Sequence, residues 1–174
     1  MRMVLAAVLL LTLAGVGVVI LDLGGEETVG RDYASTTALC REAARQAMIE
    51  GDPTTFECDW DAVAEERPAM SLNGSYAVAM AGLAGRMTVL ESEDEPALVA
   101  ISTTSETHAL SCIAGLEATR SGDRLISRPS EAPGCELTIA LGDRPGSATV
   151  SATKACGHYC GTNLALGGDF ALEK

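Results

Sequence analysis

Residues 135–141 read CELTIAL, and this stretch indicates the fold class of the chain. Cysteine, leucine and isoleucine occupy its odd-numbered positions, whereas Glu136, Thr138 and Ala140 occupy the even-numbered ones. Because side chains alternate between the two faces of a β-strand, this period of two predicts a strand with one apolar and one more polar face. Such strands are typical of antiparallel sheets that cover a core on one side.

The same alternation recurs from residue 72 to the C-terminus, interrupted by turns rich in glycine, proline and acidic residues. It predicts eight strands, at Ser75–Ala81, Arg86–Glu91, Ala97–Thr103, Thr107–Leu116, Arg124–Arg128, Cys135–Leu141, Ala148–Thr153 and Leu164–Leu172. Eight short consecutive strands favour an antiparallel up-and-down barrel, because closure leaves no exposed sheet edge; a β-sandwich is the alternative. A barrel pairs the last strand with the first and places Phe170 in the core. Residues 71–174 are therefore expected to form a mainly β domain.

A helical period replaces the alternation in the preceding segment. A serine or threonine at positions 35–37 can cap a helix over residues 38–49, which Gly51 can end. Leu39, Ala43 and Ala47 lie one turn apart, so we expect this face, with Cys40 beside it, to be buried.

A second, shorter helix is expected from Asp59 to Glu66, where Pro68 prevents its continuation. Cys58 immediately precedes this helix and can reach back to Cys40 in the first one. We call residues 34–70 the helical clip, because a disulfide between these two cysteines would join the two helices.

The N-terminal segment, residues 1–23, has no charged side chain between Met3 and Leu21. A helix of that length nearly crosses a hydrocarbon core of about 30 Å. Arg2 precedes this uncharged stretch and acidic residues follow it, so the N-terminus is expected in the cytoplasm. We expect a single-pass anchor in a bacterial inner membrane, in contact with lipid through residues 3–21, and a periplasmic domain after a tether at 24–33. A cleaved secretory signal is the alternative.

Six cysteines follow this segment: Cys40, Cys58, Cys112, Cys135, Cys156 and Cys160. An even number in an exported chain indicates disulfides, and six cysteines allow fifteen pairings. Order along the chain suggests Cys40–Cys58, Cys112–Cys135 and Cys156–Cys160. A metal site at the last pair, with His158 between them and His108 as a further ligand, is the disfavoured alternative because the spacing is unusual for zinc.

The net charge of −12 excludes nucleic acid and anionic lipid headgroups as expected partners, because phosphate binding needs clustered lysine and arginine. Residues 22–70 hold half of the acidic residues, either as a solvated stalk or as a docking surface for a cationic protein. Phe56 and Trp60 stand among these acids and are interface candidates, although packing between the clip and the sheet is the favoured role for Trp60.

The sequence has no Gly-x-Ser-x-Gly elbow, phosphate-binding loop or dinucleotide fingerprint. We therefore expect no catalytic, cofactor or metal site. The hypothesis is a non-enzymatic, membrane-anchored binding or accessory protein, a small subunit that contacts another membrane or periplasmic protein. Ala14, Gly15 and Gly17 offer a small-residue patch for contact with a partner helix. Alternatives are a periplasmic inhibitor of a cationic hydrolase such as lysozyme, and a lipocalin-like carrier with a small ligand inside the barrel.

Overall fold

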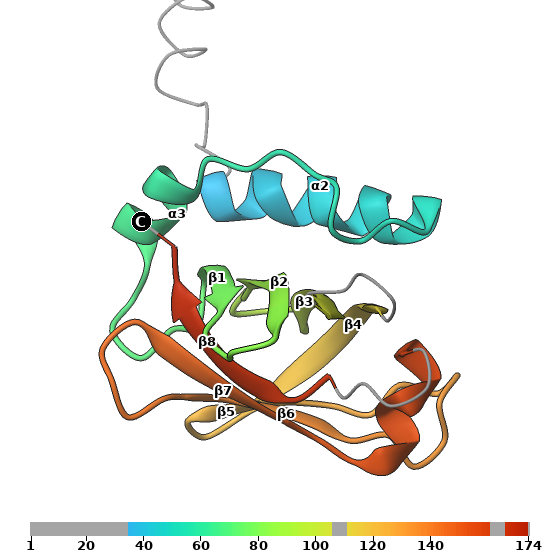
Figure 1. Cartoon of the computed structure of the whole chain (residues 1–174). Helices are drawn as coiled ribbons and strands as arrows, with labels where there is room; N and C mark the ends of the chain where they lie inside the picture. Colours follow the sequence, from blue (N-terminus) through green and yellow to red (C-terminus); the bar gives the residue numbers. More distant parts are fainter. Residues whose placement is uncertain (1–34, 106–110, 161–165, 174) are drawn as a thin grey trace, which may run out of the picture. The chain divides into compact units, whose positions relative to one another are not determined.

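The computed structural model describes residues 35–105, 111–160 and 166–173 (Figure 1). Two helices come first, α2 (Thr36–Glu50) and α3 (Trp60–Glu66). They are followed by β1 (Gly74–Val78), β2 (Leu83–Leu90), β3 (Ala97–Ser105), β4 (Ser111–Ser121), β5 (Arg124–Ser127), β6 (Leu137–Leu141), β7 (Ser147–Ala152), the 3₁₀ helix η1 (Lys154–Tyr159) and β8 (Gly168–Leu172).

Among the helices that the structure describes, none has the length and apolar character needed to cross a membrane. The expected anchor over residues 1–23 lies outside the described residues, as do its small residues Ala14, Gly15 and Gly17 and the tether at 24–33.

The eight strands close into a barrel in the order β1 to β8, and every neighbouring pair is antiparallel. Closure occurs between β1 and β8, where Tyr76 lies opposite Leu172 and Val78 opposite Phe170. The barrel, rather than the sandwich, is therefore the architecture, and the expected place of the last strand beside the first is confirmed.

Large side chains from the strands fill the interior of the barrel. Those that are at most 1% exposed include Tyr76, Met87, Ile101, Leu125, Leu137, Ile139 and Phe170. Burying each such side chain contributes about 1.5–3 kcal/mol relative to exposure. The buried hydroxyl of Tyr76 donates a hydrogen bond to the carbonyl oxygen of Leu72 at 2.9 Å, so this polar group is satisfied inside the core.

The observed strands differ from the expected ones mainly at their ends. β2 begins at Leu83 and includes Gly85, which the sequence pattern assigns to a turn. A Cβ atom at Gly85 would lie 2.0 Å from the carbonyl oxygen of Ser102 in β3, so the absence of a side chain permits this close approach. β4 continues to Ser121, beyond its expected end at Leu116.

Both expected helices of the clip are present, and α2 lies across the outer side of the barrel (Figure 1). The expected buried face of α2 is only partly correct. Cys40 and Ala47 are buried, but Leu39 is 64% exposed and the face is turned toward Arg41 and Ala44. Arg41 decides this orientation, because its guanidinium donates hydrogen bonds to the carbonyl oxygens of Leu90 and Pro96 at the barrel.

The disulfide between Cys40 and Cys58 is confirmed and joins α2 to the segment before α3. The other two expected pairings are wrong, because Cys112 bonds to Cys160 and Cys135 bonds to Cys156.

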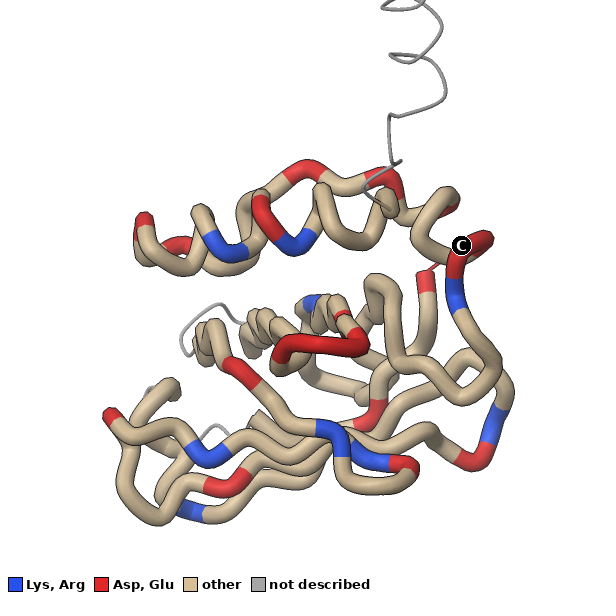
Figure 2. Tube along the Cα trace, turned by 180° about the vertical axis from the view of Figure 1, so that it is seen from behind, with Lys and Arg blue, Asp and Glu red and all other residues tan. Residues whose placement is uncertain are grey.

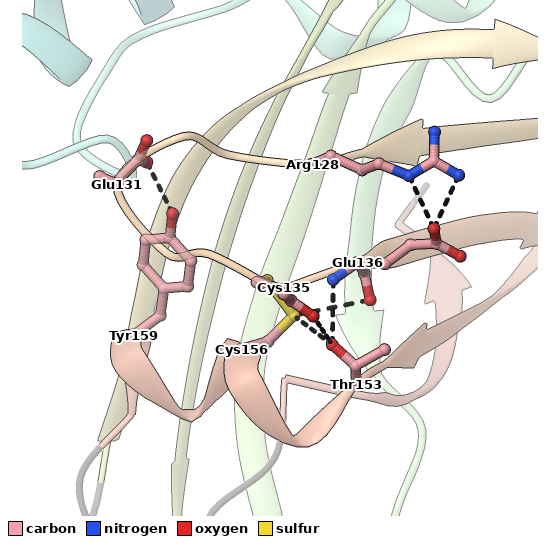
Figure 3. Close-up of a disulfide and its surroundings, with 8 residues drawn as sticks. Arg128, Glu131, Cys135, Glu136, Thr153, Cys156 and Tyr159 are labelled. Carbon is pink, nitrogen blue, oxygen red and sulfur yellow. Dashed lines mark hydrogen bonds and ion pairs between the residues drawn. A yellow bond between two sulfur atoms is a disulfide. The ribbon is translucent and has the colours of Figure 1, made fainter.

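The 3₁₀ helix η1 explains this exchange of partners. It turns the chain so that Cys156 meets Cys135 just before β6, while Cys160 lies in an isolated antiparallel bridge with Cys112 of β4. The Cys135–Cys156 disulfide ties η1 to the segment before β6 (Figure 3). The Cys112–Cys160 disulfide ties the residue that follows η1 to β4.

Candidate interaction site

Hydrogen bonds join the end of α3 to the start of α2 in the helical clip. Asp59 caps α3 by accepting a hydrogen bond from the backbone N–H of Ala62 at 3.1 Å. Glu66 at the other end of α3 accepts hydrogen bonds from the backbone N–H groups of Thr36 (2.8 Å) and Thr37 (3.1 Å) at the start of α2. Burial raises the pKa of Glu66, but these hydrogen bonds outweigh it and the net pKa is lowered.

Phe56 and Trp60 form an edge-to-face aromatic pair with ring centroids 5.9 Å apart. Both are half-buried, and both pack against a second apolar cluster, formed by Cys40, Ala44, Val63, Leu90 and Leu98. This cluster joins the clip to β2 and β3, so the expectation that Trp60 packs between the clip and the sheet agrees with its surroundings. The part of Trp60 that is not covered faces solvent.

Trp60 lines two hollows, and both are also lined by Cys58 and Asp59. The first, of about 570 Å³, adds Phe56 and Glu57. The second, of about 540 Å³, is formed by α3 together with residues of β1, β2 and the end of β8, and is lined in addition by Asp61, Ala64, Ser75, Arg86, Leu172 and Glu173. We call this second hollow the Trp60 hollow.

Acidic residues outnumber basic ones along the helical clip (Figure 2). Residues 46–66 contain seven acidic and no basic side chains. The arginines of α2 are already paired, because both Arg41 and Arg45 contact the Glu95 carboxylate at 2.9 Å. Hydrogen bonds from Arg41 and then Arg45 lower the pKa of Glu95. Arg45 also contacts Glu42 of its own helix at 3.1 Å. Among the described residues, the ion pairs of Arg41 and Arg45 therefore do not include the acids of residues 46–66.

Arg86 is the basic side chain that lines the Trp60 hollow, and Glu173 pairs with it. The Nε atom of Arg86 lies 2.7 Å from the Glu173 carboxylate, which also accepts a hydrogen bond from the Ser75 hydroxyl. The hydrogen bond from Ser75, followed by that from Arg86, lowers the pKa of Glu173 despite partial burial. Asp59 and Asp61 are then left as the excess negative charge of the hollow.

A separate groove of about 710 Å³ runs along β4 and the loop after β5. β4 pairs with β3 through residues 111–118 but with β5 only through Thr119–Ser121, and Pro129 then directs the chain away from β4. The buried hydroxyl of Ser127, which lines this groove, has no hydrogen-bond partner in the described structure. No sequence pattern indicated this groove.

Residues around η1 form hydrogen bonds that stabilise the local fold near the Cys135–Cys156 disulfide (Figure 3). Tyr159 donates a hydrogen bond to Glu131 at 2.6 Å, and burial together with this carboxylate raises the pKa of Tyr159. The Thr153 hydroxyl donates to the carbonyl oxygen of Gly134 at 2.8 Å and accepts from the backbone N–H of Glu136 at 3.0 Å. These contacts hold the Cys135–Cys156 region in place.

The disfavoured metal site is not assembled in the part of the chain that the structure describes. All six cysteines are in disulfides, and within the described ranges no three histidine, cysteine or acidic side chains gather in a way that could hold a metal ion. His158 is exposed beside Tyr159, while His108 lies outside the described residues.

Sequence reasoning identified Phe56 and Trp60 but missed the barrel residues of the Trp60 hollow. Arg86, Leu172 and Glu173 come from β2 and the end of β8, far from Trp60 along the chain. The acids beside Trp60 were the only local signal. The remaining lining depends on barrel closure, which brings the C-terminal end of the chain next to α3 (Figure 1).

No family model matches this chain, and neither the curated proteins nor the solved structures contain a significant match. The arrangement of its own residues is therefore the basis for a functional proposal.

Proposed function

We propose that this chain is a non-enzymatic, membrane-anchored binding protein outside the cytoplasm, an accessory subunit that contacts another membrane or periplasmic protein through its helical clip. The observation that carries this proposal is the aromatic pair Phe56 and Trp60, partly exposed beside two hollows in a surface rich in carboxylates. Partly exposed aromatic side chains set in hollows are typical anchors of protein interfaces.

The packed interior of the barrel supports a surface-binding role over the lipocalin-like alternative. Inward-facing side chains such as Tyr76, Met87 and Phe170 form one continuous cluster and are at most 1% exposed. A carrier of small molecules needs an internal cavity of several hundred Å³, and side chains occupy that position here.

The construction of the clip supports a preorganised surface. The Cys40–Cys58 disulfide and the bonds from Glu66 to the start of α2 fix the two helices before any partner arrives. A rigid surface loses less conformational entropy on binding, which favours affinity. The clip also follows the expected anchor closely in sequence, so a membrane-bound partner is within reach.

An inhibitor of a cationic hydrolase is the second candidate, and the run of seven acids in residues 46–66 favours it. Acidic surfaces accelerate association with basic clefts. Adding the detergent-solubilised chain to a lysozyme assay tests this candidate. Loss of lysozyme activity that Trp60→Ala relieves would support it, whereas full activity at micromolar concentrations of the chain would contradict it.

Native electrophoresis after mild detergent extraction tests the main proposal. We expect the wild-type chain to migrate in a complex much larger than its own 17.9 kDa, and Trp60→Ala to release it. Ile113→Ala is the matched control, because Ile113 is a large, partly exposed side chain on β4 outside the clip. Migration of the wild-type chain as a lone species, or equal release by both variants, would contradict the proposal.

A further inference from the structure

We infer that the Trp60 hollow is a receptor for a lysine or arginine side chain presented by a basic segment of the partner protein. This inference rests on the proposed function and names the chemistry that the clip recognises. Its elements are one aromatic ring, a short apolar wall and an excess of carboxylates, brought together between α3 and the barrel.

The walls of the hollow match the two parts of a long basic side chain. Trp60, Ala64 and Leu172 offer apolar surface to the methylene stem. Asp59 and Asp61 supply carboxylates for the charged head group, which also gains from contact with the face of an indole ring. The methylene stem thus contacts apolar surface, and the charged head group contacts carboxylates.

The charges of the hollow favour a cation that comes from outside. Three acidic side chains, Asp59, Asp61 and Glu173, line it with one basic side chain, Arg86. Arg86 already contacts Glu173 at 2.7 Å, so it does not neutralise the two aspartates. Glu57 lines the neighbouring hollow and adds to the same negative potential. A positive side chain that enters is therefore attracted at both short and intermediate range.

Other occupants fit less well. A metal ion needs several ligands around one point, and in the described parts of the chain no such group of three is present. A second copy of this chain carries a net charge of −12 and is repelled, and the same holds for nucleic acid and anionic lipid. A basic polypeptide segment agrees with both the shape and the charge of the hollow.

The single tryptophan of the chain gives a direct readout of this site. Hexalysine titrated into the full chain in uncharged detergent micelles should change the fluorescence of Trp60 in a saturable way. Hexaglutamate should produce no change. Affinity for hexalysine should fall by about tenfold or more between about 0.05 and 0.3 M NaCl, because salt shortens the Debye length. The absence of a saturable change with hexalysine would overturn the inference.

Two matched variants separate the hollow from a general effect of net charge. Asp61→Asn should weaken hexalysine binding by about two- to fivefold, the usual worth of one partly exposed ion pair. Asp143→Asn removes the same charge at the exposed turn between β6 and β7, outside the lining of the hollow, and should leave binding unchanged. Equal losses in both variants would overturn the inference in favour of diffuse attraction. Thermal unfolding of each variant shows that the fold is retained.

The hexalysine titration and the native electrophoresis test the cation site and the proposed function separately. If Trp60→Ala releases the native complex but hexalysine does not bind, the clip is an interface that does not recognise a basic side chain. If hexalysine binds as expected but the wild-type chain migrates alone, the cation site stands and the accessory-subunit proposal fails.

Discussion

At the residue scale, Arg41 carries a buried charge between α2 and the barrel. Its side chain is only 6% exposed. It donates to the carbonyl oxygens of Leu90 and Pro96 and pairs with Glu95 at 2.9 Å. Removing it takes this donor away from the two carbonyl oxygens, whereas Glu95 keeps its contact with Arg45, so Arg41→Ala should destabilise the fold by about 2–4 kcal/mol.

Arg45→Ala provides the matched control. Arg45 contacts the same Glu95 carboxylate at 2.9 Å, but its side chain is 40% exposed. Exposed ion pairs contribute about 0–1 kcal/mol, so this variant should unfold close to the wild-type temperature. Thermal or urea unfolding measures both variants. Equal losses would show that Arg41 acts only as a surface charge.

At the element scale, Glu66 makes the attachment of α3 to α2 dependent on pH. Its pKa is lowered in the folded state, so its carboxylate stabilises the clip above its ordinary pKa of 4.5 and this contribution is lost as the pH falls below that value. Glu66→Gln should therefore be less stable than the wild type at pH 7, and the difference should shrink as the pH falls below 4.5. Glu65→Gln removes a neighbouring exposed carboxylate and should follow the wild type across this pH range.

The strand β8 closes the barrel and carries Phe170, which is 1% exposed. A chain that ends at Leu166 lacks this strand, so it exposes the edges of β1 and β7 together with apolar core surface. We expect such a chain to aggregate, because unpaired edges join other strands. Light scattering and calorimetry measure this outcome. A soluble chain that unfolds cooperatively at the wild-type temperature would mean that β8 is dispensable.

At the scale of the whole molecule, the chain has only six aromatic residues, so large rings contribute little to the stability of its core. The disulfides compensate for this deficit. Cys112→Ser with Cys160→Ser removes one disulfide and leaves Cys135–Cys156 intact, at a cost of about 2–5 kcal/mol. Cys112→Ser with Cys135→Ser should be less stable and carry two free thiols. Thiol titration and melting temperatures compare the two double variants, and the reverse order would support the order-based pairing instead.

The architecture of the barrel follows from local patterns that a sequence displays directly. Alternation in CELTIAL places Leu137 and Ile139 inward, and both are buried as predicted. Closure was favoured over a β-sandwich in the sequence, because an eighth strand carrying Phe170 would otherwise leave two edges unpaired, and the structure decided between the two. The strand prediction succeeded because the period of two depends on neighbours in the sequence. Closure joins residues far apart in the chain, and it was favoured because unpaired strand edges carry a physical penalty.

Tertiary structure alone decided the orientation of α2, two of the three disulfide pairings and the Trp60 hollow. Helical spacing cannot show that Arg41 has carbonyl acceptors waiting on β2 and the following loop. Order along the chain indicated Cys40–Cys58 correctly but not the other two pairings, because only the turn at η1 brings Cys160 to Cys112. Glu173 meets α3 only after the barrel closes. These features join residues far apart in the chain, so their geometry exists only in the folded molecule.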